Sequence, residues 1–279
     1  MLKTRFIFAP LLVAVFVPPS LFAVDGVVLI NQASALAGNV TPGDAPGFPV
    51  TIGQPGSYRL SGNLIAPDFN TNVIEITASN VSIDLNGFAI LGNNVCTGSS
   101  GVAMSCTAGT SATGTGIYAD IGTLIRNITI RNGSIQGMGA YGIRVVNSRN
   151  VLINGINESN SGQIGMYVQF AVVSESAVNS NGMLGLLAQV SIVDRVTASG
   201  NYTPPTVNSV AGGIFGYGSR VINCYMYENS IGLTVYDGSF TGNYMGLNMT
   251  DISNLNLSVN MGQNFCGNSP NAVCPGAVN

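Results

Sequence analysis

Seven short segments share one pattern, a glycine followed by a large apolar residue and then by alternating side chains: GIYAD (116–120), GIRVV (142–146), GMYVQ (165–169), GLLAQ (185–189), GIFGY (213–217), GLTVY (232–236) and GLNMT (246–250). A related segment without the glycine is VIEIT (73–77). The glycines lie 14 to 28 residues apart. Repeats of about this length are typical of a solenoid in which each repeat forms one turn.

Each segment alternates as a β-strand does, with one face apolar. The predicted inward pairs are Ile74/Ile76, Ile117/Ala119, Ile143/Val145, Met166/Val168, Leu186/Ala188, Ile214/Gly216, Leu233/Val235 and Leu247/Met249. A second strand is predicted to follow each of them, as in NVSIDLNG (80–87), NITIRNG (127–133), NVLINGIN (150–157) and SRVINCYM (219–226). The chain has 31 Asn and 36 Gly, residues that tolerate the left-handed backbone needed at corners between strands.

Stacked turns would pair each strand with the same strand above and below it, so that equivalent side chains form columns. A β-sandwich would need hairpin turns, and a doubly wound α/β fold would need helical stretches between strands, neither of which the sequence shows. We therefore predict an all-β, single-domain solenoid of about ten turns.

Composition excludes several functions. Only 8% of residues are charged and 46% are hydrophobic, which is not the composition of a disordered chain. Nine Lys and Arg stand against twelve Asp and Glu, with no basic run, so nucleic acid is not an expected partner. The absence of His makes a zinc site unexpected, and we predict no bound metal.

The first 23 residues read as a secretory signal, with Lys3 and Arg5 before an apolar run that ends at Pro18 and Pro19. An uncleaved membrane anchor is the alternative, but the run is shorter than the roughly 20 residues that span a bilayer. After cleavage the chain would have no Lys and no membrane span. The protein is expected to be secreted and extracellular, on the cell surface, or periplasmic.

Export permits disulfides. Cys96 and Cys106 are ten residues apart, and Cys266 and Cys274 are eight apart, so each pair is predicted to close a local loop. Cys224 remains, in an apolar stretch, and is interpreted as a buried free thiol.

The predicted boundaries are a signal peptide at 1–23, an N-terminal cap and first strand at 24–56, the solenoid at 57–262, and a disulfide-stapled tail at 263–279. An amphipathic helix between Leu29 and Ala37 would cover one end of the stack, and the tail would cover the other. Such covers are needed because an open end exposes apolar core and strand edges.

The glycine-led segments and the stretch VSIDLNGFAILG (81–92) resemble secreted right-handed parallel β-helix proteins of the pectin-lyase-like superfamily. The resemblance covers about residues 57 to 262. It implies a right-handed β-helix with a small N-terminal cap, and a glycan groove on the outer face of the first sheet. The superfamily includes polysaccharide lyases, glycoside hydrolases, esterases, adhesins and phage tailspikes, so the fold does not decide the activity.

Two outward columns can be read on that face. The first is Glu75, Tyr118, Arg144, Tyr167, Leu187, Phe215, Thr234 and Asn248; the second is Thr77, Asp120, Val146, Gln169, Gln189, Tyr217, Tyr236 and Thr250. Rings suit the C–H face of a sugar and amides suit its hydroxyls. The predicted glycan contacts are Tyr118, Tyr167, Gln169, Gln189, Phe215, Tyr217 and Tyr236. Alternatively, aromatic residues simply favour strands and pack beneath a loop.

Glu75, Asp120 and Arg144 form the most reactive group on this face and are the candidate catalytic residues. In a lyase, Arg144 or Tyr118 would be the base, and calcium held by Asp120 and Glu75 would be a possible cofactor. In a hydrolase, Glu75 and Asp120 would be the carboxyl pair. A surface ion pair between Arg144 and Asp120 is the simpler interpretation.

Neither the pectate lyase nor the polygalacturonase motifs of the superfamily occur here: there is no Asp-Asp pair, no His and no Lys after residue 3. The expected function is therefore contact with polysaccharide, or with a surface glycan, without cleavage. A divergent lyase or hydrolase is the first alternative, and a structural spacer or adhesin is the second.

Overall fold

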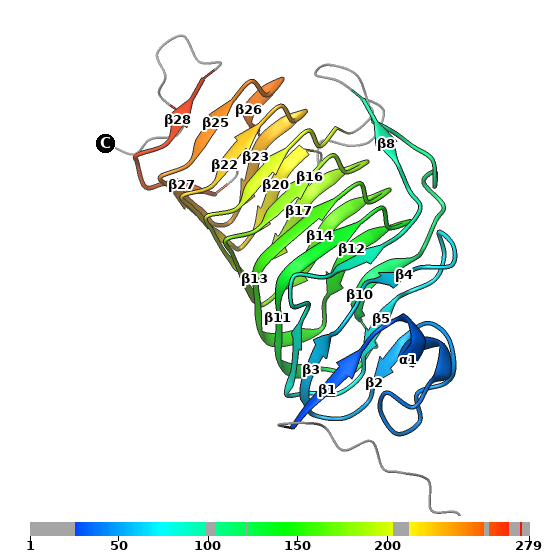
Figure 1. Cartoon of the computed structure of the whole chain (residues 1–279). Helices are drawn as coiled ribbons and strands as arrows, with labels where there is room; N and C mark the ends of the chain where they lie inside the picture. The colour runs from blue at the N-terminus through cyan, green and yellow to red at the C-terminus, as the bar shows by residue number, and fades with distance from the viewer. Residues whose placement is uncertain are drawn as a thin grey trace, which may run out of the picture.

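The computed structural model describes residues 26–98, 104–120, 122–202, 212–253, 257–267 and 274. These residues form a parallel β-solenoid of about nine turns, slightly fewer than predicted. Figure 1 shows the strands stacked along one axis from the N-terminal end to the C-terminal end. The proposed signal peptide at 1–23 lies outside the described residues.

One face of the solenoid is a nine-stranded parallel sheet with one strand from each turn. Its strands are β2 (Val50–Ile52), β5 (Ile74–Ile76), β10 (Thr115–Ala119), β12 (Tyr141–Val145), β14 (Ile164–Gln169), β17 (Leu184–Gln189), β20 (Gly212–Tyr217), β23 (Ile231–Tyr236) and β26 (Thr250–Ser253). We call this the small sheet.

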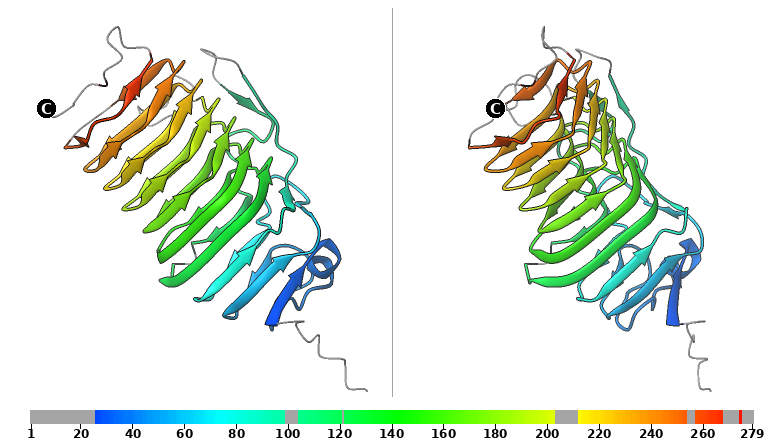
Figure 2. Two further views of the ribbon diagram at one scale, coloured as in Figure 1. Left: turned by 60° about the vertical axis from the view of Figure 1, so that its left-hand side comes forward. Right: turned by 90° about the vertical axis from the view of Figure 1, so that its left-hand side faces the viewer.

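The rest of the surface is a seventeen-stranded sheet, the large sheet, which most turns enter twice (Figure 2). Its strands are β1 (Val27–Ile30), β3 (Gly56–Leu60), β4 (Leu64–Ile65), β6 (Val81–Asp84), β7 (Ala89–Leu91), β11 (Ile125–Gln136), β13 (Ser148–Ser159), β15 (Ala171–Ser174), β16 (Ala177–Asn179), β18 (Ile192–Asp194), β19 (Thr197–Ser199), β21 (Arg220–Ile222), β22 (Tyr225–Tyr227), β24 (Ser239–Thr241), β25 (Tyr244–Gly246), β27 (Val259–Asn260) and β28 (Phe265–Cys266).

The predicted interior columns are confirmed over most of the stack. Ile74, Ile117, Ile143, Met166, Leu186, Ile214 and Leu233 are in register on successive turns. All of them are buried within one continuous core. This burial of aliphatic columns is the main favourable term in the fold, because no single turn could bury its own apolar face.

The prediction that the last segment, GLNMT (246–250), forms a strand of the small sheet is wrong. Leu247 and Met249 are exposed, whereas Ile252 in β26 pairs with Leu233. Leu247 has left-handed backbone, with φ 56°. It forms a corner there, so the strand begins later than the glycine pattern indicates.

From Asn147 onward each turn bends at three corners, and at least one residue at each corner has positive φ. The first corner follows the small sheet and is formed by Asn150, Phe170, Val190, Gly218, Asp237 and Leu257. The second lies within the large sheet at Gly155, Glu175, Arg195, Asn223, Gly242 and Gln263. The third returns to the small sheet at Asn160, Ser180, Gly200, Glu228 and Leu247.

Inside the third corner, buried asparagines form a ladder of hydrogen bonds along the axis. The amide of Asn181 donates to Asn201 (3.0 Å), Asn201 donates to Asn229 (2.9 Å), and Asn229 donates to Asn248 (3.0 Å). Each side-chain oxygen also accepts the backbone N–H of the preceding asparagine, as for Asn181 N to Asn201 Oδ1 at 3.0 Å. The ladder satisfies backbone groups that no strand pairs at the corner.

Glu158 lies at the lower end of this ladder, in the aliphatic core. It is in register with Ile135 below and Val178 above, and its side chain is fully buried. Its carboxyl accepts hydrogen bonds from Ser161 Oγ (2.6 Å) and Asn181 Nδ2 (2.9 Å). Burial dominates over these hydrogen bonds and raises its pKa to about 8.

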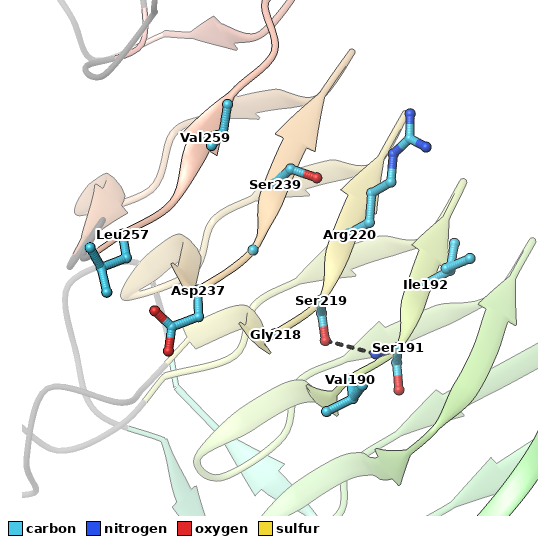
Figure 3. A pocket seen from close by; sticks show the side chains of 11 residues that line it. Val190, Ser191, Ile192, Gly218, Ser219, Arg220, Asp237, Ser239, Leu257 and Val259 are labelled. Atoms are coloured by element: carbon cyan, nitrogen blue, oxygen red, sulfur yellow. Dashed lines mark hydrogen bonds between the residues drawn. The ribbon is translucent and has the colours of Figure 1, made fainter.

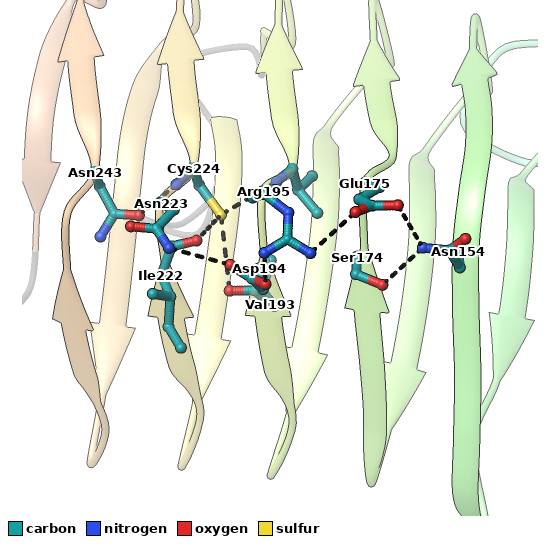
Figure 4. A network of polar contacts seen from close by, with 11 residues as sticks. Asn154, Ser174, Glu175, Val193, Asp194, Arg195, Ile222, Asn223, Cys224 and Asn243 are labelled. Atoms are coloured by element: carbon teal, nitrogen blue, oxygen red, sulfur yellow. Dashed lines mark hydrogen bonds and ion pairs between the residues drawn. The ribbon is translucent and has the colours of Figure 1, made fainter.

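The second corner carries exposed ion pairs. Arg195 contacts Asp194 and Glu175 (3.0 Å to the latter), and Glu175 accepts from Asn154 (3.2 Å), as Figure 4 shows. Such exposed pairs contribute little to stability. Beneath them Cys224 is a buried free thiol, as predicted, and burial raises its pKa to about 12.

A short helix, α1 (Gln32–Ala37), covers the N-terminal end of the stack. The sequence predicted helix from Leu29, but Leu29 and Ile30 belong to β1, which pairs with β3. Asn31 starts the helix, because its side chain accepts the backbone N–H of Ser34 at 3.0 Å. Residues 268–273 and 275–279 of the predicted C-terminal cover lie outside the described residues.

Both predicted disulfides are present. Cys96 and Cys106 join β8 (Cys96–Thr97) to β9 (Ser105–Cys106) in an antiparallel hairpin, and Cys266 is bonded to Cys274. No helix in the described part of the chain is long and apolar enough to cross a bilayer.

Candidate functional site

The outer face of the small sheet carries most of the predicted columns of side chains, but Val146 and Thr234, which were predicted to face outward, are buried. Register confirms the first column from Glu75 through Tyr118, Arg144, Tyr167, Leu187 and Phe215 to Thr234. Its last member is Ser253 and not Asn248, which is buried in the asparagine ladder. In the second column, Gln169, Gln189, Tyr217 and Tyr236 are in register, but Thr250 pairs with Ile231.

Arg144 is the centre of the lower part of this face. Its Nε and Nη2 donate to Oδ2 of Asp120 at 3.1 and 2.7 Å. Its guanidinium lies over the rings of Tyr141 and Tyr167, at 5.0 and 5.3 Å from their centroids. These contacts come from three successive turns and hold the cation in one orientation.

The same contacts oppose a role for Arg144 as a base. Burial alone lowers the pKa of a guanidinium, but the hydrogen bond to Asp120 and neighbouring charges outweigh it, so that the pKa of Arg144 is raised. Tyr118 donates its hydroxyl to the backbone oxygen of Asp120 at 2.9 Å. Burial, with the charge of Asp120 adding to it, raises the Tyr118 pKa. Both groups therefore hold their protons more firmly than in water.

The three candidate catalytic residues converge only in part. Asp120 and Arg144 form an ion pair, and Asn147 donates to the other oxygen of Asp120 at 2.8 Å. Glu75 is beside Tyr118 on the next turn, but no hydrogen bond or ion pair joins it to Arg144. Among the described residues no group of three His, Cys, Asp or Glu is placed to hold a metal ion.

The candidate glycan contacts differ in accessibility. Tyr217 is 48% exposed, whereas Phe215 is 9% exposed and lies against Tyr236, with ring centroids 5.7 Å apart. Gln169 accepts from Asn147 N and donates to Gln189 Oε1, both at 3.1 Å. Phe215 therefore supports the face from beneath, Tyr217 is open to solvent, and the half-buried members are Tyr118, Tyr167, Gln169, Gln189 and Tyr236.

Sequence reasoning missed Tyr141 and a ladder of aromatic residues on the large sheet. Tyr141 precedes its glycine and packs on Arg144 from outside the alternating pattern. On the large sheet, Tyr225, Tyr244 and Phe265 form a ladder of exposed rings with centroids 4.6 and 4.9 Å apart. The signal was the recurrence of an aromatic residue after Cys224, Asn243 and Asn264, which occupy one corner position.

Comparison with known proteins assigns no family. No protein-family model and no curated protein matches the chain. Among solved structures, ORF18 of Geobacillus virus E2 is similar at 12% identity and a TM-score of 0.24, over 71% of this chain and 41% of that chain. The chain thus spans less than half of that viral protein.

Proposed function

We propose that the protein is exported and binds polysaccharide along the outer face of the small sheet, without cleaving it. The observation that carries the proposal is the stacking of Tyr167, Gln189, Tyr217 and Tyr236 in adjoining turns of one sheet. Equivalent residues repeat at about 4.8 Å along the axis. An extended chain lying along that axis would meet ring faces and hydrogen-bonding groups in succession.

Two polar side chains on this face have hydrogen-bond donors that could bind a ligand. Gln189 accepts from Gln169, but within the described chain its Nε2 donates no hydrogen bond. Arg144 uses Nε and Nη2 for Asp120, so its Nη1 faces no partner among the described residues. A guanidinium held by its neighbours loses little freedom on binding, which favours a sugar hydroxyl or a uronate carboxylate as its contact.

Two further observations support export and the absence of cleavage. Disulfides persist in oxidising compartments, and this chain has two, which join cysteines ten and eight residues apart. The raised pKa values of Arg144 and Tyr118 disfavour proton abstraction at this site. A divergent lyase or hydrolase therefore ranks below a binder, as does a spacer or adhesin that does not bind glycans.

The proposal predicts slower migration of the protein, lacking residues 1–23, through native gels that contain a bound polysaccharide. Uronate-rich and neutral polysaccharides should be compared. Tyr217→Ala is expected to weaken retention about fivefold, because roughly 1 kcal/mol of ring burial is lost. The matched control is Tyr225→Ala, since Tyr225 is 44% exposed on the large sheet and its loss should leave retention unchanged.

New unsaturated or reducing ends in the polysaccharide would contradict binding without cleavage and favour the enzyme. Equal retention of Tyr217→Ala and the original protein would move the binding site off this face. Unretarded migration with every polysaccharide would favour the alternative of a structural spacer or adhesin.

A further inference from the structure

A strip of exposed apolar side chains runs along the large sheet beside the first corner. Leu152, Val172 and Ile192 are in register on three successive turns, and each is between 37% and 43% exposed. Val190, at the corner itself, is 50% exposed. A contiguous apolar surface of this kind on an extracellular protein marks an interaction site more often than scattered apolar residues do.

Two residues at the corner beside this strip have a backbone conformation that is energetically unfavourable for their side chains. Phe170 and Val190 have φ of 51° and 50°, the left-handed region, which Asn150, Gly218 and Asp237 occupy in the same column. Left-handed backbone is unfavourable for large side chains and most unfavourable for a β-branched one. Val190 thus combines left-handed backbone with a side chain that is half exposed to water.

Next to Val190 the surface forms a shallow hollow of about 550 Å³, shown in Figure 3. Apolar side chains of Val190, Ile192 and Val259 line it, together with two opposite charges, Arg220 and Asp237. The two charged side chains point away from each other in Figure 3. Neither makes an ion pair or side-chain hydrogen bond with another described residue.

We propose that this surface is a two-fold symmetric interface with a second copy of the same chain, in which Arg220 of each copy pairs with Asp237 of the other. A two-fold axis brings residue i of one copy to residue j of the other and also j to i. A patch with one unpaired cation, one unpaired anion and apolar side chains around them is complementary to itself. A partner with charge of a single sign would leave one of the two charges without a counter-ion.

The interface also accounts for the apolar residues at the corner. Valine at position 190 lies against Gly218, since a Cβ on that glycine would be 3.6 Å from the Val190 side chain. Its outer methyl groups would be removed from water by the second copy. The strip formed by Leu152, Val172 and Ile192 would extend the contact along the axis over further turns.

Sedimentation velocity at micromolar concentrations of the protein lacking residues 1–23 tests the proposal. We expect a dimer that dissociates on dilution. Arg220→Asp and Asp237→Arg should each weaken dimerisation at least about tenfold, because each places like charges together twice. The double variant Arg220→Asp/Asp237→Arg should restore it. Arg126→Asp is the control, since it makes the same charge change at an exposed residue several turns away.

Val190→Asn separates an interface effect from misfolding. Asparagine adopts left-handed backbone readily, so at concentrations where the protein is monomeric the thermal midpoint should rise by about 2–4 °C. The same variant should weaken the dimer, because apolar surface is lost. A monomer at all concentrations, a filament, or a double variant that fails to restore dimerisation would overturn the proposal.

Discussion

Replacing Glu158 with glutamine is expected to prevent most of the loss of stability that this protein shows as the pH rises from about 4.5 to 8. The folded protein keeps Glu158 protonated up to about pH 8, whereas the unfolded chain ionises it near its ordinary value of 4.5. The folded state therefore binds the proton more tightly. This group contributes its full stability below pH 4.5 and loses it progressively up to pH 8.

The expected size is large because the group is fully buried between Ile135 and Val178. At about 1.4 kcal/mol for each pH unit, the difference between 4.5 and about 8 corresponds to the order of 5 kcal/mol. Glutamine has nearly the same shape as the protonated acid. Its oxygen can accept from Asn181 and its nitrogen can donate to Ser161, in the positions of the present hydrogen bonds.

Urea unfolding followed by far-ultraviolet circular dichroism between pH 4.5 and 9 measures this effect. The difference in unfolding free energy between Glu158→Gln and the original protein should grow with pH in favour of glutamine. Glu228→Gln, at an exposed corner, is the control and should show no such trend. A constant difference between Glu158→Gln and the original protein across this range would show that Glu158 is not buried as described.

The second large effect is expected from the asparagine ladder. Asn201→Ala should destabilise the protein by about 3–5 kcal/mol, because several buried partners lose a hydrogen bond at once. Oδ1 of Asn201 accepts the backbone and side-chain N–H of Asn181, both at 3.0 Å. Its Nδ2 donates to the backbone oxygen of Val178 (3.0 Å) and to Asn229 (2.9 Å).

Asn157→Ala is the matched control for this prediction. Asn157 is exposed on β13, and its side chain makes no hydrogen bond within the described residues. Its replacement should change the free energy of unfolding by less than about 0.5 kcal/mol. Equal losses for Asn201→Ala and Asn157→Ala would mean that the ladder does not stabilise the interior.

The architecture was predictable because a solenoid repeats its physical requirements in every turn. Ile117, Ile143 and Ile214 occupy one interior column in the structure, as alternation predicts. The same alternation placed Tyr118, Arg144 and Tyr167 on the outer face. The local pairing of Cys96 with Cys106 followed from their spacing within a loop-like stretch.

The errors arose where backbone conformation, and not alternation, decides which way a side chain points. Leu247 reads as an inward strand residue, but its left-handed backbone makes it an exposed corner. Glu158 lies in a polar stretch, and only the register with Ile135 and Val178 identifies it as a core residue. The strip beside Val190 was equally hidden, since its members come from different turns.

Site accessibility could not be predicted from residue type. Phe215 and Tyr217 both occupy outward positions, yet Phe215 is covered and Tyr217 is open to solvent. The difference depends on which side chains of neighbouring turns pack over each ring, as Tyr236 does over Phe215. Columns of outward residues therefore identify a face, and the structure selects the groups on it that a ligand can reach.

The central claim is that successive turns lie in one register, so that residues far apart in sequence become vertical neighbours. Electron–electron distance measurements between spin labels test it directly, with one label at Ser57 and the other at Leu152, Ile192 or Ser239. These positions share one column and are three, five and seven turns from Ser57.

At about 4.8 Å for each turn, the backbone separations should be about 14, 24 and 34 Å, with equal increments between the three pairs. Such increments would confirm the stack. Distances that scatter without this order, or that fail to increase toward Ser239, would contradict the account.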